Sequence, residues 1–81
     1  MVEAQGDIVV ATIPKGRGEE VRIALSTFKG KTFVALRVWY RDDHEELKPS
    51  SKGLNLKIEY LPALASALAA ALEKARADGL L

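Results

Sequence analysis

The stretch of this 81-residue chain that could do the most chemistry is residues 26–41, "STFKGKTFVALRVWYR". It places cations among aromatic rings and contains no acidic residue; these side chains are Lys29, Lys31, Arg37 and Arg41 with Phe28, Phe33, Trp39 and Tyr40. Exposed rings can stack on unpaired bases, while Lys and Arg contact the nucleic-acid backbone. The stretch therefore indicates either a single-stranded nucleic-acid site or an ordinary half-buried strand whose outer face is solvated.

The order of residues within this stretch predicts a strand with two different faces, because successive side chains of a strand point to opposite sides. The even positions form an apolar set suited to a core: Thr32, Val34, Leu36, Val38 and Tyr40. The odd positions alternate cations and rings around one small residue: Lys31, Phe33, Ala35, Arg37, Trp39 and Arg41. Parity thus predicts that Trp39 lies on the binding face and Tyr40 in the core.

Other clusters of reactive residues do not form a catalytic or metal-binding constellation. His44 is the only histidine, it lies in the acidic run "DDHEE", and the chain has no cysteine. A zinc site or a nucleophilic triad therefore lacks its parts, and the acidic run lacks the ligand spacing of a calcium loop. We expect no enzyme activity, no cofactor and no metal.

The elements that would position the cations and rings form a meander of short strands followed by one helix. Period-two runs and turn residues predict strands at about 7–13, 20–27, 31–40 and 54–58, with a polar loop before the last strand. From Tyr60 the apolar period becomes 3.6, which predicts a helix at about 60–78. The expected fold is a single α+β domain over residues 1–81.

The predicted helix is apolar nearly all round between Tyr60 and Leu72, "YLPALASALAAAL". Such helices are buried on more than one side, and this stretch is too short to span a bilayer. We expect a homodimer whose interface includes Leu64, Ala67, Leu68, Ala71 and Leu72. The alternative is that exposed alanines only raise helix propensity.

Charge distribution is more informative than the formal net charge of +1. The middle of the chain is locally basic, since residues 28–41 and 48–57 contain cations and no acids. The N-terminus "MVEAQGD" has no signal-peptide pattern. We expect a cytoplasmic protein, nucleoid-associated if bacterial and nuclear if eukaryotic, with no membrane partner.

Residues 19–72 resemble the single-stranded-DNA-binding domain of the transcriptional coactivator positive cofactor four and its stand-alone bacterial relatives. The motifs that carry the resemblance are "FKGK" at 28–31, "VALRVWY" at 34–40 and "LKPSSKGLNL" at 47–56. The resemblance implies a four-stranded, curved antiparallel sheet followed by one helix. It also implies dimerisation through the helices and single-strand binding on the concave sheet surfaces.

The resemblance also implies roles for particular residues. It places on nucleic-acid contact positions the residues Phe28, Lys29, Lys31, Arg37, Tyr40, Lys48 and Lys52. Tyr40 then conflicts with parity, which favours Trp39, unless a bulge or bend near the end of the third strand turns Tyr40 outward. The chain departs from the family pattern at three positions, where an aromatic and two basic residues are replaced by Leu61, Ser51 and Ser26. These replacements indicate a weaker nucleic-acid contact surface.

The function expected from these observations is sequence-tolerant binding of single-stranded DNA by a homodimer acting in transcription or DNA maintenance. An RNA-binding protein or nucleic-acid chaperone is the first alternative, since stacking and phosphate contacts do not depend on the 2′-hydroxyl. A dimer that docks a peptide on the aromatic face is the second. The transcription machinery is a further expected partner.

Overall fold

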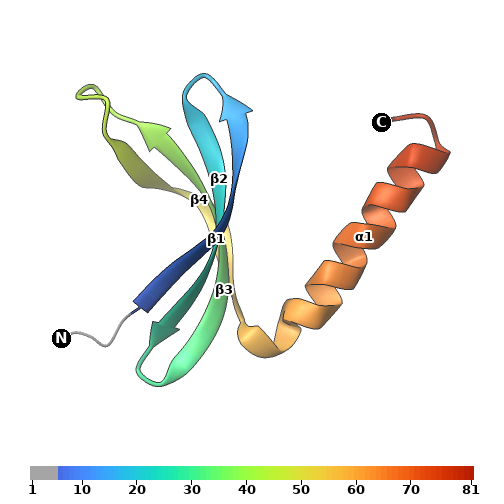
Figure 1. Cartoon of the computed structure of the whole chain (residues 1–81), viewed down its shortest axis with the longest axis horizontal. Helices are drawn as coiled ribbons and strands as arrows, with labels where there is room; N and C mark the ends of the chain where they lie inside the picture. Colours follow the sequence, from blue (N-terminus) through green and yellow to red (C-terminus); the bar gives the residue numbers. More distant parts are fainter. Residues whose placement is uncertain (1–5) are drawn as a thin grey trace.

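The computed structural model describes residues 6–81, which form one antiparallel sheet and one helix (Figure 1). The strands are β1 (Gly6–Gly16), β2 (Glu19–Phe28), β3 (Lys31–Arg41) and β4 (Leu47–Lys57), in the spatial order β1-β2-β3-β4. A 3₁₀ turn, η1 (Ile58–Tyr60), leads into helix α1 (Leu61–Ala77). This order confirms the predicted four-stranded antiparallel sheet followed by a C-terminal helix.

The first two hairpins close through two-residue turns that suit their sequences. Arg17 and Gly18 connect β1 to β2, and Lys29 and Gly30 connect β2 to β3. All four residues have positive φ, as a type I′ turn requires at both central positions. The "FKGK" motif is therefore a tight hairpin that fixes the register of β2 against β3.

That register separates the two faces of the sheet. It runs without a shift from Phe28 opposite Lys31 to Glu20 opposite Trp39. We call the side that carries the even residues of β2 and the odd residues of β3 the hollowed face, and the other side the apolar face. The apolar face includes Val21, Ile23 and Leu25 of β2 together with Val34, Leu36 and Val38 of β3.

The fourth strand is the main departure from the sequence prediction. The expected strand at 54–58 is in fact β4 over Leu47–Lys57, and only residues 42–46 remain a loop. Arg37 pairs with Gly53 and Trp39 with Pro49, so residues 50–52 bulge opposite Val38 alone. Pro, Ser and Gly in this segment are typical of a loop, but an edge strand tolerates them at a bulge.

Gly53 makes the return from this bulge possible. A Cβ atom on Gly53 would lie 2.4 Å from the Leu36 carbonyl oxygen and 2.8 Å from the Arg37 Cα. Both neighbours are backbone atoms of β3, which cannot move aside as a flexible side chain could. Only glycine lets the two strands approach this closely.

Helix α1 projects away from the sheet, so that the two form a V joined at η1 (Figure 1). It is one residue shorter at each end than predicted, because Tyr60 belongs to the 3₁₀ turn and Asp78 caps the C-terminus. Leu68 and Leu72 on this helix are 55% and 43% exposed. The helix therefore has little cover from its own sheet.

The described residues have a very small core. Val34 is the only fully buried side chain within residues 6–81, and Ile8, Ile13 and Leu54 are large exposed apolar residues of the strands. The radius of gyration is 15.0 Å, against about 12 Å for a compact chain of this length. Both values reflect the extended arrangement of sheet and helix.

Tyr40 lies on the apolar side of β3, as parity predicted, but it is exposed there. The unbroken pairing of β2 with β3 shows that the irregularity beside Arg37 and Trp39 lies in β4, so no bulge in β3 turns Tyr40 toward Trp39. Tyr40 is also 38% exposed, which is too open for the core position that parity predicted. It lies near the end of β3, beyond the part of the apolar face that is best covered.

Candidate nucleic-acid interface

A hollow of about 320 Å³ lies on the hollowed face around the indole ring of Trp39. The guanidinium carbon of Arg22 lies 4.2 Å from the centroid of this ring, within the range of a cation–π contact. Arg22 Nε also donates a hydrogen bond to the Glu20 carboxylate, which holds the guanidinium in place. The guanidinium of Arg22 therefore lies over one face of the Trp39 ring in a preassembled stack.

Arg37 lies in the same hollow and connects the face to the bulge of β4. Its Nη1 donates to the Ser50 carbonyl oxygen at 3.1 Å, and its Nη2 donates to Asn55 Oδ1 at 3.3 Å. Both contacts leave other guanidinium N–H groups free to donate to an anion. Arg37 therefore supports the bulge and can contact a phosphate at the same time.

Arg22 and Arg37 also lie directly opposite each other in the β2–β3 pair. Like charges at directly opposed positions of a sheet destabilise it. An anion bound between the two guanidinium groups would relieve this repulsion. The pair can therefore contact a phosphate, on the side of the hollow away from the Asp7 carboxylate that also lines it.

A second hollow, of about 570 Å³, opens on the same face toward the β2–β3 turn. Its lining combines two rings with polar side chains: Asp7, Ser26, Phe28, Phe33 and Asn55. Ser26 Oγ donates to Asp7 Oδ1 at 2.6 Å. This hollow offers ring faces for stacking and several hydrogen-bonding groups beside them.

Three lysines border this second hollow. Lys29 Nζ lies 5.3 Å from the centroid of the Phe28 ring, and Lys31 pairs with Phe28 across the hairpin. Lys57 pairs with Phe33 from the other side and is exposed. These lysines can follow the phosphates of a strand whose bases occupy the hollow.

The remaining predicted contact residues do not line these hollows. Tyr40 pairs with Lys48, and the alternation of β3 puts both on the side opposite Trp39. Lys52 is exposed in the bulge of the edge strand β4. The structure thus brings together Phe28, Lys29, Lys31, Arg37 and Trp39, and places Tyr40 and Lys48 on the opposite side of the sheet, while Lys52 is next to Gly53, the partner of Arg37.

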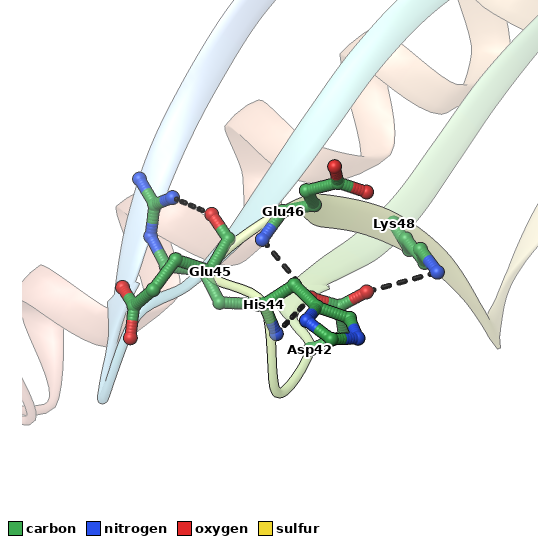
Figure 2. A network of polar contacts seen from close by, with 6 residues as sticks. Asp42, His44, Glu45, Glu46 and Lys48 are labelled. Atoms are coloured by element: carbon green, nitrogen blue, oxygen red, sulfur yellow. Dashed lines mark hydrogen bonds and ion pairs between the residues drawn. The ribbon is translucent and has the colours of Figure 1, made fainter.

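The loop between β3 and β4 is organised by the carboxylate of Asp42 (Figure 2). Asp42 Oδ1 accepts the backbone N–H groups of His44 at 2.8 Å and Glu46 at 3.0 Å, while Oδ2 lies 2.9 Å from Lys48 Nζ. The hydrogen bond from Lys48, followed by that from Glu46, lowers the pKa of Asp42 from 3.8 to about 2. The same contact raises the pKa of Lys48.

These contacts hold Lys48, near the start of β4, against the 42–46 loop. Arg41 Nη1 reinforces the loop by donating to the Glu45 carbonyl oxygen at 2.9 Å. Lys48 is thus a structural partner of Asp42 in this structure, on the side away from both hollows.

The residues predicted for a dimer interface all lie on α1. Leu64 is half-buried, whereas Ala67, Leu68, Ala71 and Leu72 are exposed. They are available for contact with another molecule.

Sequence reasoning missed Arg22, Asp7, Ser26 and Asn55 as members of the site. The position of Arg22 could have been predicted from the sequence, because a two-residue turn at Lys29 and Gly30 fixes the register that places Arg22 opposite Arg37. Asn55 could not be placed in this way, because the bulge in β4 shifts its register against β3. Asp7 depends on the pairing of β1 with β2, which has a bulge of its own near Val9.

Two other kinds of site are not formed by the described residues. Over residues 6–81, His, Cys, Asp and Glu side chains nowhere gather in a group of three or more that could hold a metal ion. In the same range, no helix has both the length and the apolar composition needed to cross a membrane.

Comparison with known proteins identifies the family of this chain. The family model described as "Transcriptional Coactivator p15 (PC4)" matches residues 15–67. The RNA polymerase II transcriptional coactivator KELP of Arabidopsis thaliana is 37% identical over 54 residues, which are 67% of this chain and 30% of KELP. The chain therefore spans less than a third of the length of this curated relative.

Solved structures share the fold at low sequence identity. A PC4 homologue from Burkholderia pseudomallei K96243 aligns with a TM-score of 0.74 and 21% identity, over 82% of this chain and 97% of that one. The bacteriophage T5 homologue of PC4, implicated in recombination-dependent DNA replication, aligns with a TM-score of 0.68 and 24% identity, over 91% and 83% of the two chains. With the family match over residues 15–67, the chain belongs to the PC4 family of transcriptional coactivators, which are not enzymes.

Proposed function

We propose that the chain binds single-stranded DNA on the hollowed face, without strong sequence selection, and does so as a homodimer. The observation that carries this proposal is the opposed pair Arg22 and Arg37 beside the ring of Trp39. A stacked base and a bound phosphate together satisfy all three side chains.

The physical basis of affinity would be stacking plus backbone charge. Each base stacked on a ring is worth about 1–3 kcal/mol, and every base offers such a face, which makes binding tolerant of sequence. Neutralised phosphates release counterions, so about five cation contacts give a slope of log K against log salt near −3.5 on single strands. Both contributions come from the same face of the sheet.

The dimer is supported by the apolar surface that the single chain leaves exposed. Helix α1 presents Leu68 and Leu72, and the apolar face presents Ile8, Ile13 and Leu54. A chain of this size with one fully buried side chain among its described residues lacks the core that stability normally requires. A second copy, with its own α1 and apolar face, would cover this surface.

A role in transcription is supported by the family and by the KELP coactivator. A role in DNA maintenance is supported by the T5 homologue, which is implicated in recombination-dependent DNA replication. A cytoplasmic, nucleoid-associated or nuclear location stays a prediction from the sequence.

The test is a competition experiment with fluorescently labelled oligo-dT. We expect unlabelled single-stranded DNA to displace the probe far better than duplex DNA, and the affinity to fall with salt as calculated above. RNA that competes as well as DNA would favour the RNA-binding alternative. Failure of every nucleic acid to bind would favour the peptide-docking alternative.

Matched variants of the two arginines sharpen this test. Arg22→Ala and Arg37→Ala should each weaken binding and reduce the salt slope by about 0.7, the contribution of one contact. Arg17→Ala, in the exposed β1–β2 turn, changes the net charge equally and serves as the control. Equal effects of all three substitutions would show that the opposed pair is not the phosphate contact.

A further inference from the structure

The second hollow contains a carboxylate, which is unexpected in a surface that attracts a polyanion. Asp7 is exposed on β1 and lines both hollows, the one around Trp39 and the one that Phe28 and Phe33 line. It has no cation partner among the ion pairs of the described residues; its contact is the hydroxyl of Ser26. A phosphate would be repelled next to the carboxylate itself, so the group suited to Asp7 is a hydrogen-bond donor on a base.

The Ser26 hydroxyl fixes Asp7 without saturating it. One hydrogen bond, 2.6 Å long, reaches Oδ1, while an ionised carboxylate has about four acceptor positions and no donor. Both oxygens therefore remain able to accept a hydrogen bond from a ligand. The carboxylate can bind two adjacent N–H groups in the bidentate manner that it uses with arginine.

Among the four DNA bases, guanine alone presents two adjacent donors on its Watson–Crick edge, at N1 and N2. Cytosine and adenine carry an amino group next to a ring nitrogen that accepts, and thymine has a single N–H between two carbonyl oxygens. A carboxylate would face a repulsive acceptor beside the donor in each of these three. Unpaired bases expose this edge to proteins that bind single strands.

Asn55 provides a complementary donor in the same hollow. The Arg37 guanidinium can only donate, so its contact at 3.3 Å assigns Oδ1 of Asn55 to the side of Arg37. The Asn55 amide N–H groups are then left to donate to an acceptor, such as O6 of guanine or the sugar-phosphate backbone. The hollow therefore pairs a double acceptor with a donor beside two stacking rings.

We propose that this hollow is a base-reading subsite that prefers guanine, with Asp7 as the residue that determines the preference. This inference rests on the proposed single-strand binding and adds a modest selectivity to it. Phe28 and Phe33 provide the stacking surface, and Ser26 positions the carboxylate.

The test uses three thymidine nonamers that differ only at the central position, which is thymine, guanine or hypoxanthine. Hypoxanthine keeps O6 and N1–H of guanine and lacks the N2 amino group. We expect the guanine probe to bind about fivefold or more tightly than the thymine probe, the lower limit for a bidentate base contact. The hypoxanthine probe should fall between the two.

Variants assign the preference to the carboxylate. Asp7→Asn replaces one acceptor by a donor, so the guanine-to-thymine affinity ratio should fall to about one, and Ser26→Ala should reduce it partly. Asp43→Asn makes the same change of charge in the exposed 42–46 loop and should leave the ratio as in the wild type.

The outcomes separate this inference from the function on which it rests. If the wild type binds all three probes equally, or Asp7→Asn strengthens all three by one factor, the guanine subsite is wrong while single-strand binding stands. If the wild type binds none of them, the proposed function fails as well.

Discussion

At the scale of single residues, the structure assigns different surroundings to the adjacent rings Trp39 and Tyr40. Trp39 lies in a hollow against Arg22, while Tyr40 lies on the opposite side with Lys48. A guanidinium stacked on an indole keeps the ring in one orientation before any ligand arrives, which lowers the entropy lost on binding. Trp39 is therefore the better candidate for stacking.

We predict that Trp39→Ala weakens binding to oligo-dT by about 1–3 kcal/mol, because a stacked base loses its platform. The salt slope should stay as in the wild type, since no cation is removed. Fluorescence anisotropy at several salt concentrations measures both quantities. Tyr40→Ala is the matched control with a small expected effect, and a larger loss for Tyr40 than for Trp39 would contradict the assignment.

The Asp42 carboxylate gives the protein a defined response to acid. Because its pKa in the folded protein, about 2, is below the ordinary value of 3.8, ionised Asp42 stabilises the fold above about pH 4. This contribution is lost as the pH falls from about 4 toward 2. Protonation also releases Lys48 and the two backbone N–H groups of the loop.

We predict that Asp42→Asn destabilises the protein at neutral pH and that the difference from the wild type shrinks between about pH 4 and pH 2. Urea unfolding at a series of pH values measures the difference in unfolding free energy between the variant and the wild type. Asp43→Asn removes a neighbouring carboxylate and should show no such pH dependence. A difference that stays constant down to pH 2 would mean that the charge of Asp42 does not stabilise the loop.

At the scale of elements, the bulge in β4 connects the stability of the edge strand to the site. Residues 50–52 leave the regular pairing, and Arg37 holds the displaced backbone through the Ser50 carbonyl oxygen. Gly53 then returns the strand to β3 at a distance that only glycine allows. The orientation of Arg37 therefore depends on the bulge as well as on β3.

We predict that Gly53→Ala destabilises the protein by about 1–3 kcal/mol, the usual effect of forcing extra volume into a packed contact. It should also weaken oligo-dT binding, because the displaced bulge no longer orients Arg37. Urea unfolding and anisotropy measure the two effects. Ser51→Ala, at an exposed position of the same bulge, should change stability by no more than about 0.5 kcal/mol. If Gly53→Ala had the stability and the oligo-dT affinity of the wild type, the close approach of β4 to β3 at Gly53 would be contradicted.

At the scale of the whole molecule, sheet and helix leave each other largely uncovered (Figure 1). An amphipathic or apolar helix gains most of its stability from packing and is marginal alone in water. The exposed leucines of α1 and the apolar face of the sheet are the surfaces that the proposed dimer would cover. Covering them with a second copy of the chain makes the fewest assumptions.

We predict that Ala71→Asp, in the apolar part of α1, dissociates or unfolds the protein, since an unpaired charge in an apolar interface is strongly unfavourable. Sedimentation equilibrium at micromolar concentration, together with circular dichroism, distinguishes the two results. Ala77→Asp, at the last helical residue, makes the same change beyond the apolar stretch and should leave the assembly intact. A wild-type protein that is a stable monomer would refute the dimer.

The sequence by itself determined the features that depend on local chemistry. A β-branched apolar run predicted the first strand, and alternation predicted the second and third. The "FKGK" motif predicted the tight hairpin, because turn geometry follows from neighbours along the chain. The 3.6-residue period predicted the helix to within a residue at each end. The resemblance to the PC4 family could also be recognised from the sequence, because the family motifs are short local patterns.

Only the tertiary structure decided which residues meet. Pro49, Ser50 and Gly53 favour a loop locally, yet pairing with β3 makes them part of a strand, because an edge strand can bulge and still keep most of its hydrogen bonds. The positions of Asp7 and Asn55 beside Phe33 follow from two such bulges, which no periodicity in the sequence marks. Contacts between strands depend on register, and register at a bulge is fixed by packing across the sheet, not by the order of residues along it.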